Sequence, residues 1–524
     1  MIYRSPFPDV EIAPVSLATL VLDSARARGD KVALLDGPSG QETTFVELVR
    51  RVERTAAGLQ ERGFRKGDVA LLCTPNCSEF AIAFLAVALA GGATTPMSPS
   101  FTEGEMAAQI ADSGAVLAFV APELAVQVER AGKGRLRALF CFGETDLAPT
   151  VRSLESAGPV PVVEIDPSED VVVLPYSSGT TGTPKGVMLT HRNLVAIQAQ
   201  MGPVEATTSA DVVIAVLPFF HIYGLSVILL LALCRGATLV VFPRFEMESF
   251  LAAVERFRVT RLPLVPPLLL RLARDARVAD FDLSSVRTVI SGAAPLAPEI
   301  AAEVAARLGC LVKQGYGMTE LSPGGHMHPE DRGAAPPGSV GLAHPNTETR
   351  LVDPATGLDV DEGEPGEIWY RGPQVMKGYL GKPTETAAAI SPEGWLRTGD
   401  IGRIDSEGRL YVVDRLKELI KYNGYQVAPA ELEALLLTHE GIADVAVIPL
   451  ANTESGEIPK AFVIPRAGAH LTEDGVMQFV AERVAHYKKV RAVEFVDDIP
   501  RSPTGKILRR VLVERERAVR GQGG

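Results

Sequence analysis

The chain has 524 residues and a formal net charge of −12 at pH 7, with 46% hydrophobic and 22% charged residues. This length exceeds what one ordinary hydrophobic core requires, so the sequence predicts a soluble, globular protein of at least two domains. The acidic balance argues against a nucleic-acid-binding protein, whose surface would need a basic footprint. A polyanionic ligand would therefore need a local group of basic residues.

Cysteine usage and the N-terminal segment point to a compartment. The five cysteines are scattered and odd in number, which fits reduced thiols. The first residues lack the basic and then apolar pattern of a signal peptide, so we expect a cytoplasmic protein.

The uncharged stretch 212–234 is interrupted by Pro218, His221 and Gly224. The resulting pieces of about 10 residues are shorter than the roughly 20 of a membrane span. We predict a buried strand, a turn and a core helix there, and no membrane insertion.

Residues 16–170 alternate between helical and strand patterns. Residues 45–58 are amphipathic, residues 68–73 form a short apolar strand pattern, and residues 80–90 read as an almost wholly apolar helix. This alternation predicts an α/β fold with largely parallel strands. No residue before Tyr176 is typical of a catalytic group, so we interpret this segment as scaffold.

The next segment is a candidate phosphate-binding loop. An apolar run at 171–174 leads into a loop of Ser, Thr and Gly that ends at Lys185. Hydroxyl and backbone N–H groups can converge on an anion there, and Lys185 adds a positive charge. It is not a Walker A loop, because Pro184 precedes the lysine and Gly186 follows it. A plain surface loop is the alternative, but such loops rarely emerge from a buried strand with a lysine at their end.

Three further segments carry candidate site residues. Thr190 is a good N-cap for a helix. His221 lies between Pro218 and Gly224, which predict a turn, so a core histidine and a functional histidine both remain open. Residues 291–296, SGAAPL, follow an apolar strand and leave space for a planar ligand where parallel strands end, although they also fit a tight strand–helix turn.

The motif QGYGMTE, residues 314–320, combines an aromatic face with oxygen ligands. Tyr316 is flanked by glycines and can stack on a purine. Thr319 and Glu320 offer the oxygen ligands that nucleotide-bound Mg²⁺ prefers.

Further along the chain, Asp400 can bind a ribose diol or serve as a turn residue, and Arg415 would make a second ribose contact plausible.

The last hundred residues read as a small α/β unit. A helix begins near Ala430, strands are expected at 445–449, 461–465 and 490–496, and a second helix begins at Thr472. The final loop, PRSPTGK, presents Lys506 before an apolar helix start. Such loops are most often solvated tails.

Together these motifs resemble the adenylate-forming superfamily of acyl-CoA synthetases, peptide-synthetase adenylation domains and luciferases, and within it the 4-coumarate–CoA ligases. The resemblance runs nearly end to end, from residues 3–12 to residues 500–510. It implies a large N-terminal domain of layered sheets and helices at 1–415. It also implies a small mobile C-terminal α/β domain at 416–524, pivoting at Lys417.

The resemblance also implies roles for individual residues. For catalysis these are Lys506, His221, Lys421 and Gln426. For ATP and AMP they are Ser177, Ser178, Gly179, Thr180, Thr181, Lys185, Ala293, Gln314, Gly315, Tyr316, Thr319, Asp400, Arg415 and Lys417. For the acyl pocket they are Tyr223, Val227, Ile290, Ala293, Ala294, Gly315, Pro323, Gly324 and Met327. CoA would meet Arg244, Asn423 and Gly424, and Glu320 would help to place magnesium.

The implied function is a two-step ligase that uses ATP, Mg²⁺, CoA and a small carboxylic acid, expected to be 4-coumarate or a related hydroxycinnamate. A ligase for medium-chain fatty or other aryl acids, an adenylation domain that loads a carrier protein, and a non-catalytic nucleotide-binding protein are alternatives. Two positions depart from the plant-type ligases. Asn423 replaces a lysine of the hinge loop, and Gly324 replaces a valine, which predicts a wider end of the acyl pocket.

Overall fold

The structure is a computed structural model that describes residues 1–177, 184–423, 425–452, 455–502 and 505–521. Its element order mixes helices and strands throughout, which confirms the predicted α/β class.

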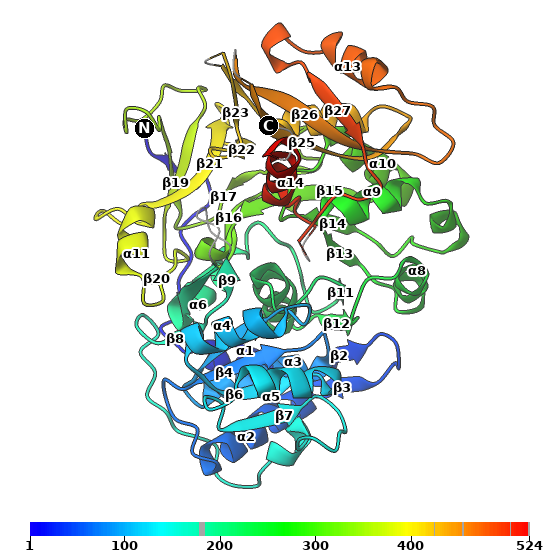
Figure 1. Ribbon diagram of the computed structural model, residues 1–524. Helices are drawn as coiled ribbons and strands as arrows, with labels where there is room; N and C mark the ends of the chain where they lie inside the picture. The colour runs from blue at the N-terminus through cyan, green and yellow to red at the C-terminus, as the bar shows by residue number, and fades with distance from the viewer. Residues whose placement is uncertain (178–183, 424, 453–454, 503–504, 522–524) are drawn as a thin grey trace.

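Two large sheets form the body of the N-terminal part (Figure 1). In the described residues, the first has the order β20-β10-β8-β5-β4-β6-β7, with β9 on β10, and its central strands are parallel. Its strands are β4 (Val69–Cys73), β5 (Ala93–Met97), β6 (Ala115–Val120), β7 (Ala138–Cys141), β8 (Val171–Val173), β9 (Tyr176–Ser177), β10 (Lys185–Thr190) and β20 (Gly378–Tyr379).

The second large sheet has the order β17-β16-β15-β14-β13-β11-β12-β2-β3. Its inner strands pair in parallel, and the strand pairs toward its two ends are antiparallel. Its strands are β2 (Val32–Asp36), β3 (Glu42–Thr44), β11 (Val212–Ala215), β12 (Thr238–Val241), β13 (Arg261–Leu264), β14 (Thr288–Ser291), β15 (Leu311–Gly317), β16 (Gly324–Met327) and β17 (Leu342–Ala343). The parallel strands end side by side, as the alternation of helices and strands predicts.

Helices cover both faces of both sheets. Alternate residues of β4 show this, because Ala70 and Leu72 belong to the core between the two sheets, whereas Leu71 and Cys73 belong to an outer core. Strands buried on both faces are apolar throughout. The central layer holds α1 (Leu17–Arg26), α2 (Phe45–Glu61), α3 (Ser78–Leu89), α6 (His191–Gln200) and α7 (Leu231–Arg235). The outer layers hold α4 (Glu103–Ser113) and α5 (Ala125–Ala131) on one side, and α8 (Met247–Arg256), α9 (Pro266–Arg274) and α10 (Pro298–Leu308) on the other.

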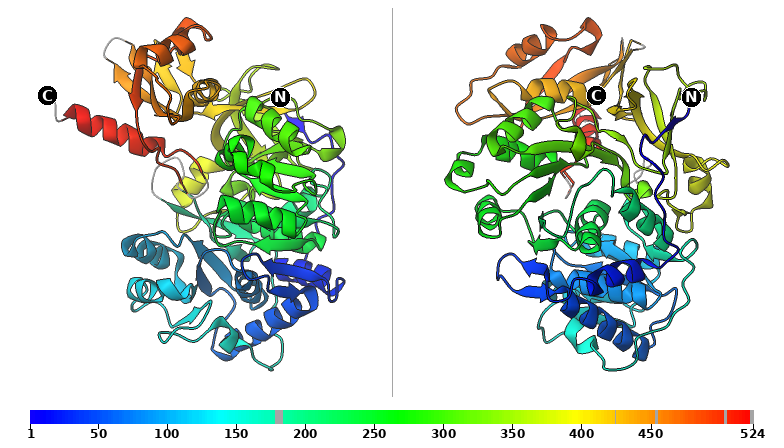
Figure 2. Two further views of the ribbon diagram at one scale, coloured as in Figure 1. Left: turned by 90° about the vertical axis from the view of Figure 1, so that its right-hand side faces the viewer. Right: turned by 180° about the vertical axis from the view of Figure 1, so that it is seen from behind.

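A third, antiparallel sheet completes the N-terminal part. The N-terminal segment runs along the back of the molecule to reach it, as the right-hand view of Figure 2 shows, and pairs there with β18. The strands are β1 (Tyr3–Arg4), β18 (Glu348–Val352), β19 (Gly366–Arg371), β21 (Leu396–Ile404) and β22 (Leu410–Arg415), and α11 (Pro383–Ala389) lies beside β21 and β20.

The C-terminal part has its own sheet and its own core. One face packs on α12 (Pro429–Leu437) and α13 (Glu473–Ala481), and the other on α14 (Arg509–Gly521), which projects from the body in the left-hand view of Figure 2. The strands are β23 (Ile420–Tyr422), β24 (Tyr425–Val427), β25 (Ile442–Asn452), β26 (Gly456–Pro465) and β27 (Ala492–Phe495). The predicted strands and helices of this part are thereby confirmed.

The stretch 212–234 is a strand, a turn and a helix, as predicted, but its helix begins as a π-helix at Tyr223–Leu230 and continues as α7. None of the helices in the described ranges combines the length and apolarity that crossing a bilayer requires. The N-cap prediction for Thr190 is also confirmed. Its hydroxyl accepts a hydrogen bond from the backbone N–H of Asn193. In return, the backbone N–H of Thr190 donates to Asn193 Oδ1.

Candidate active site

Lys506 reaches the N-terminal part from a tight loop of the C-terminal part. Gly505 has a left-handed φ of 79° and lies against the start of α9, where a Cβ would come within 3.2 Å of Pro267 Cγ. Burial and the nearby Arg415 lower the pKa of Lys506 to about 8, while Asp400 and Glu320 oppose the shift. The lysine charge therefore lies among two carboxylates and an arginine of the N-terminal part.

His221 lies within the field of the same lysine. Burial, followed by the charge of Lys506, lowers the pKa of His221 to about 3, so the imidazole is neutral at physiological pH. The backbone N–H of Tyr223 donates to His221 Nδ1 at 3.2 Å. Because Nδ1 accepts this bond, the ring proton belongs on Nε2, which can donate to a substrate carboxylate. The sequence left open whether this histidine belongs to the core, and its position beside Lys506 favours a functional role.

A pair of polar side chains joins the QGYGMTE motif to the third sheet. The Tyr316 hydroxyl donates to Asp400 Oδ2 at 2.6 Å, and Arg415 Nε lies 3.4 Å from Asp400 Oδ1. Burial raises the pKa of Asp400, and Arg415 opposes the shift. One face of the Tyr316 ring stacks on Tyr370, with centroids 6.2 Å apart and planes at 23°. Asp400, Arg415 and Tyr316 are thus gathered as a nucleotide site would require.

Other residues predicted to bind the nucleotide lie on the same strand ends. Gln314 Oε1 accepts a bond from the backbone N–H of Leu296 at 3.3 Å, which ties β15 to the SGAAPL loop. Within that loop Ala293 adopts a left-handed φ of 71°, a conformation that costs energy for a residue with a Cβ. Ser178, Gly179, Thr180 and Thr181 lie outside the described residues.

Glu320 is held by two hydroxyl groups. Its Oε1 accepts bonds from Ser177 at 2.8 Å and from Tyr379 at 3.0 Å, and its side chain is buried. Lys185 lies over the Tyr379 ring, 4.8 Å from the centroid. Tyr379 reaches this place because β20 pairs with β10. The sequence analysis did not identify Tyr379, because no motif marks this residue.

The donors fit a magnesium ion that arrives with a nucleotide. Within the described ranges, no group of three or more His, Cys, Asp or Glu side chains is arranged to hold a metal. Mg²⁺ is commonly bound through one or two carboxylates together with substrate phosphates and water. A single buried carboxylate at Glu320, beside the hydroxyl of Ser177, matches that donor set.

The predicted acyl-pocket residues converge on one side of β14 and β15. The Tyr223 hydroxyl donates to the backbone carbonyl of Ile290 at 3.3 Å, and a Cβ at Gly315 would come within 3.2 Å of Met327 Cε. Tyr223, Val227, Ile290 and Met327 share one core cluster, and Ala293 packs against it. Ala294 lies in the SGAAPL loop, and Pro323 precedes β16.

The prediction of a wider pocket end at Gly324 is corrected by the packing. A Cβ at this position would lie 2.6 Å from His344 Cε1 and 3.0 Å from Ile197 Cδ1. The volume that a missing side chain would leave is therefore filled by the ring of His344. The sequence could not reveal this, because β17 brings His344 to β16 through a pairing that spans an intervening loop.

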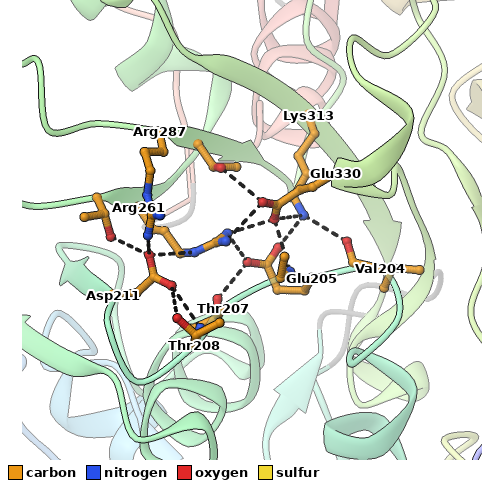
Figure 3. Close-up of polar contacts among 12 residues, drawn as sticks. Val204, Glu205, Thr207, Thr208, Asp211, Arg261, Arg287, Lys313 and Glu330 are labelled. Carbon is orange, nitrogen blue, oxygen red and sulfur yellow. Dashed lines mark hydrogen bonds and ion pairs between the residues drawn. The ribbon is translucent and has the colours of Figure 1, made fainter.

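A buried network of ion pairs lies next to this pocket (Figure 3). Arg261 Nη1 lies 2.8 Å from Glu330 and 2.5 Å from Glu205, and Lys313 Nζ lies 2.7 Å from Glu330. Lys313 also pairs with Glu205, and Asp211 pairs with Arg261 and Arg287. Three carboxylates thus face three cations. Sequence reasoning missed this network, although a charged residue in each of the apolar strands β13 and β15 is a signal that buried partners exist.

The residues expected to bind CoA make no contact with the group of His221, Asp400 and Lys506 in the described part of the chain. Arg244, Lys421 and Asn423 are exposed, and among the described contacts none hydrogen-bonds or ion-pairs with His221, Asp400 or Lys506. Gln426 lies opposite Lys421 in the β23–β24 pair, and Gly424 lies outside the described residues. Lys417 lies in the turn after β22, where the backbone N–H of Glu418 donates to the Arg415 carbonyl at 2.9 Å.

The geometry defines an α/β protein in which Lys506 of the C-terminal part lies among Asp400, Glu320 and Arg415 of the N-terminal part. Residues 21–380 match the model of the AMP-binding enzyme family, and residues 431–506 match that of the AMP-binding enzyme C-terminal domain. The chain belongs to the AMP-binding enzyme family.

Particular relatives are similar over nearly the whole chain. It is 43% identical to 4-coumarate–CoA ligase 5 of Oryza sativa subsp. japonica, over 98% of this chain and 96% of the relative. It is 42% identical to 4-coumarate–CoA ligase 2 of Nicotiana tabacum, with the same coverage. Among solved structures, ATP-bound MatB from Rhodopseudomonas palustris has a TM-score of 0.88 and 30% identity, over 96% of this chain and 100% of that chain.

Proposed function

We propose that this protein is an ATP-dependent carboxylate–CoA ligase that acts on 4-coumarate and related hydroxycinnamates through an acyl-AMP intermediate. The observation that carries the proposal is the position of Lys506 among Asp400, Glu320 and Arg415, close to the neutral His221. This arrangement suits an acid and a nucleotide meeting at one point. The full-length similarity to curated 4-coumarate–CoA ligases supports the same reaction and acid class.

In the first step the acid carboxylate attacks the α-phosphorus of ATP, and pyrophosphate leaves. The protein contributes positioning and charge neutralisation. Lys506 bridges the carboxylate and the α-phosphate, and His221 Nε2–H orients the carboxylate. Thr319 contacts the phosphate, and the loop 177–185 with Lys185 accompanies the pyrophosphate. Glu320 would hold Mg²⁺, which supplies charge neutralisation at the phosphates when bound.

In the second step the CoA thiol attacks the acyl carbon and AMP leaves. The C-terminal domain, residues 416–524, turns about Lys417 relative to residues 1–415, which withdraws Lys506 and brings the Lys421–Gln426 hairpin to the site. Arg244 binds a CoA phosphate. Asn423 and Gly424 contact CoA through backbone groups, because this chain lacks the second lysine there. We place this reaction in the cytoplasm, in keeping with five free cysteines.

The pocket composition supports an aromatic acid. Tyr223 forms one wall, and small residues at Ala293, Ala294 and Gly315 leave a flat slot. A slot of this kind accommodates a ring conjugated to a short acid better than a flexible alkyl chain. A hydroxyl in such a pocket is expected to discriminate among hydroxycinnamates by about 10²-fold or less.

The test is an acid panel with the full-length protein, ATP, Mg²⁺ and CoA. We expect CoA thioesters from 4-coumarate, caffeate and cinnamate, each with a higher kcat/KM than octanoate. Octanoate as the best substrate would overturn the acid class. Release of AMP and pyrophosphate without a CoA thioester would instead indicate a carrier-loading adenylation domain, and no release at all would indicate a binding protein.

A further inference from the structure

His344 is a buried histidine whose ring nitrogens form no hydrogen bond with the part of the chain that the structure describes. It follows β17, and its backbone N–H donates to the Gly325 carbonyl at 3.1 Å. The residue is 0% exposed, yet neither Nδ1 nor Nε2 has a hydrogen-bond partner among the described residues. Buried polar side chains nearly always have a partner, so an unused imidazole at this depth points to a ligand group.

The ring edge of His344 lies against Gly324, a residue of the proposed acid pocket. A Cβ built on Gly324 would lie 2.6 Å from Cε1 and 3.1 Å from Nδ1 of His344. Gly324 pairs with Gly317, and three residues later Met327 pairs with Gly315, which is part of the proposed pocket. His344 thus occupies the place that a side chain at position 324 would take in the wall of the pocket.

His344 lies close to the strand that carries the pocket residue Gly315, because β17 pairs with β16 and β16 with β15. The charge of Lys313 acts on it, and Lys313 precedes Gly315 by two residues on β15. Lys313 and Gly315 are alternate residues of one strand, so their side-chain positions face the same side of the sheet. An acid ring that extends from the carboxylate into this pocket would therefore pass beside Gly324 and His344.

The chemistry of this histidine is that of a neutral donor and acceptor. Burial, followed by the nearby Lys313, lowers the pKa of His344 to about 3. A neutral imidazole offers one N–H donor and one acceptor nitrogen, which suits a phenolic hydroxyl. The neighbouring His326 differs, because its Nδ1 already bonds with the Tyr370 hydroxyl at 2.5 Å.

We propose that His344 is a specificity-determining residue that hydrogen-bonds the ring hydroxyl of the acid. The inference rests on the proposed function, since it assumes an aromatic acid in this pocket. Gly324 and His344 then act as a pair, in which the glycine makes room and the histidine fills that room with a polar edge. The pocket remains narrow but gains a group that recognises a hydroxyl.

The test compares acids with and without the hydroxyl in His344→Leu, which removes the nitrogens and keeps an apolar group of similar size. For the wild type we expect kcat/KM for 4-coumarate to exceed that for cinnamate by at least ~10-fold, within the range for one hydroxyl. In His344→Leu this ratio should fall about tenfold, with cinnamate turnover retained. His344→Asn, which keeps a hydrogen-bonding group, should restore part of the ratio.

His328→Leu is the matched control, because it alters a second buried histidine of the same strand region, whose Nε2 bonds the Gly333 carbonyl. It should leave the ratio unchanged. An unchanged ratio in folded His344→Leu overturns the role of His344 alone, as does a wild type that shows no preference for 4-coumarate over cinnamate. A wild type that converts no aromatic acid overturns both this inference and the proposed function.

Discussion

The two parts of the molecule differ in how their site residues are held. In the N-terminal part, Glu320 is tied to Ser177 and Tyr379, and Asp400 to Tyr316, by contacts between different sheets that share one body. The C-terminal part has a core of its own and meets this body through a small shared apolar cluster of Ile401, Leu419 and Ala428 and through single contacts. These include Gly505 against Pro267, and Arg274 Nη2 donating to the Leu437 carbonyl at 3.3 Å.

This difference suggests different roles for the site residues of the two parts. Groups that recognise the nucleotide and the acid are fixed before substrates arrive, as a preorganised site requires. Lys506 belongs instead to a part whose main core is separate and which shares only the small cluster of Ile401, Leu419 and Ala428 with the body. Substitutions in the two parts should therefore separate the two half-reactions, and each prediction below tests that separation.

The largest expected effect is that of Lys506→Ala. Losing a positioned charge at a developing anion should reduce acyl-AMP formation by at least ~10²-fold. Conversion of supplied acyl-AMP to the CoA thioester should survive, because Lys506 belongs only to the first arrangement. Single-turnover assays of the two half-reactions measure this. Arg510→Ala, an exposed charge on α14, is the control and should leave both rates intact; equal losses in both half-reactions for Lys506→Ala would refute the two-arrangement scheme.

Lys417→Pro should affect the other half-reaction. Lys417 lies in the tight turn after Arg415, where a fixed φ hinders rotation between the two parts. We expect thioester formation to slow on the order of tenfold while acyl-AMP accumulates. Lys417→Ala keeps the backbone free and is the control. If the proline variant melts normally and turns over at the wild-type rate, the pivot lies elsewhere.

The pH dependence should report on the delivered lysine. Adenylation needs protonated Lys506, whose pKa is lowered to about 8. The kcat/KM for ATP should therefore be level below pH 8 and fall about tenfold per unit above it. His221, with a pKa of about 3, adds no acid limb near neutrality. Lys506→Arg, which stays charged, should remove the alkaline fall. A fall with the same midpoint in the acyl-AMP-to-thioester half-reaction would assign it to another group.

The smallest expected effect is that of a substitution in the N-terminal part. Tyr379→Phe removes the hydroxyl that bonds Glu320 and keeps the ring beneath Lys185. Because Ser177 still orients the carboxylate, we expect the requirement for Mg²⁺ in adenylation to rise by a factor of up to about ten. Tyr411→Phe removes a comparable hydroxyl, bonded to Asp405, and is the control. An unchanged Mg²⁺ dependence would mean that Tyr379 only supports the fold.

The sequence predicted correctly those features that depend on residues close together in the chain. Alternating apolar segments gave the α/β class, and Thr190 marked a helix start because an N-cap bond is made within three residues. Asp400, Arg415 and Lys506 were each identified within a motif. Their meeting depends on sheet pairings and on domain placement, which no local pattern contains.

The residues that sequence reasoning missed owe their positions to long-range pairing. Tyr379 reaches Glu320 because β20 pairs with β10, about 190 residues earlier in the chain. His344 fills the space beside Gly324 because β17 lies on β16. The first interpretation of Gly324 as empty volume was wrong for this reason: a small residue opens space only where no neighbour from a distant segment occupies it.

The ion-pair network of Figure 3 constrains how the acid preference of this enzyme can evolve or be engineered. Replacing Lys313 alone would leave Arg261 as the one network cation that pairs with both Glu205 and Glu330, and breaking such a buried pair commonly costs about 3–5 kcal/mol. Single substitutions at Lys313 or Arg261 are therefore expected to lower stability as well as to change the pocket. Exchanges at Ala294, Gly324 and His344, which lie outside the network, are expected to change the shape and polarity of the pocket without leaving a charge unpaired.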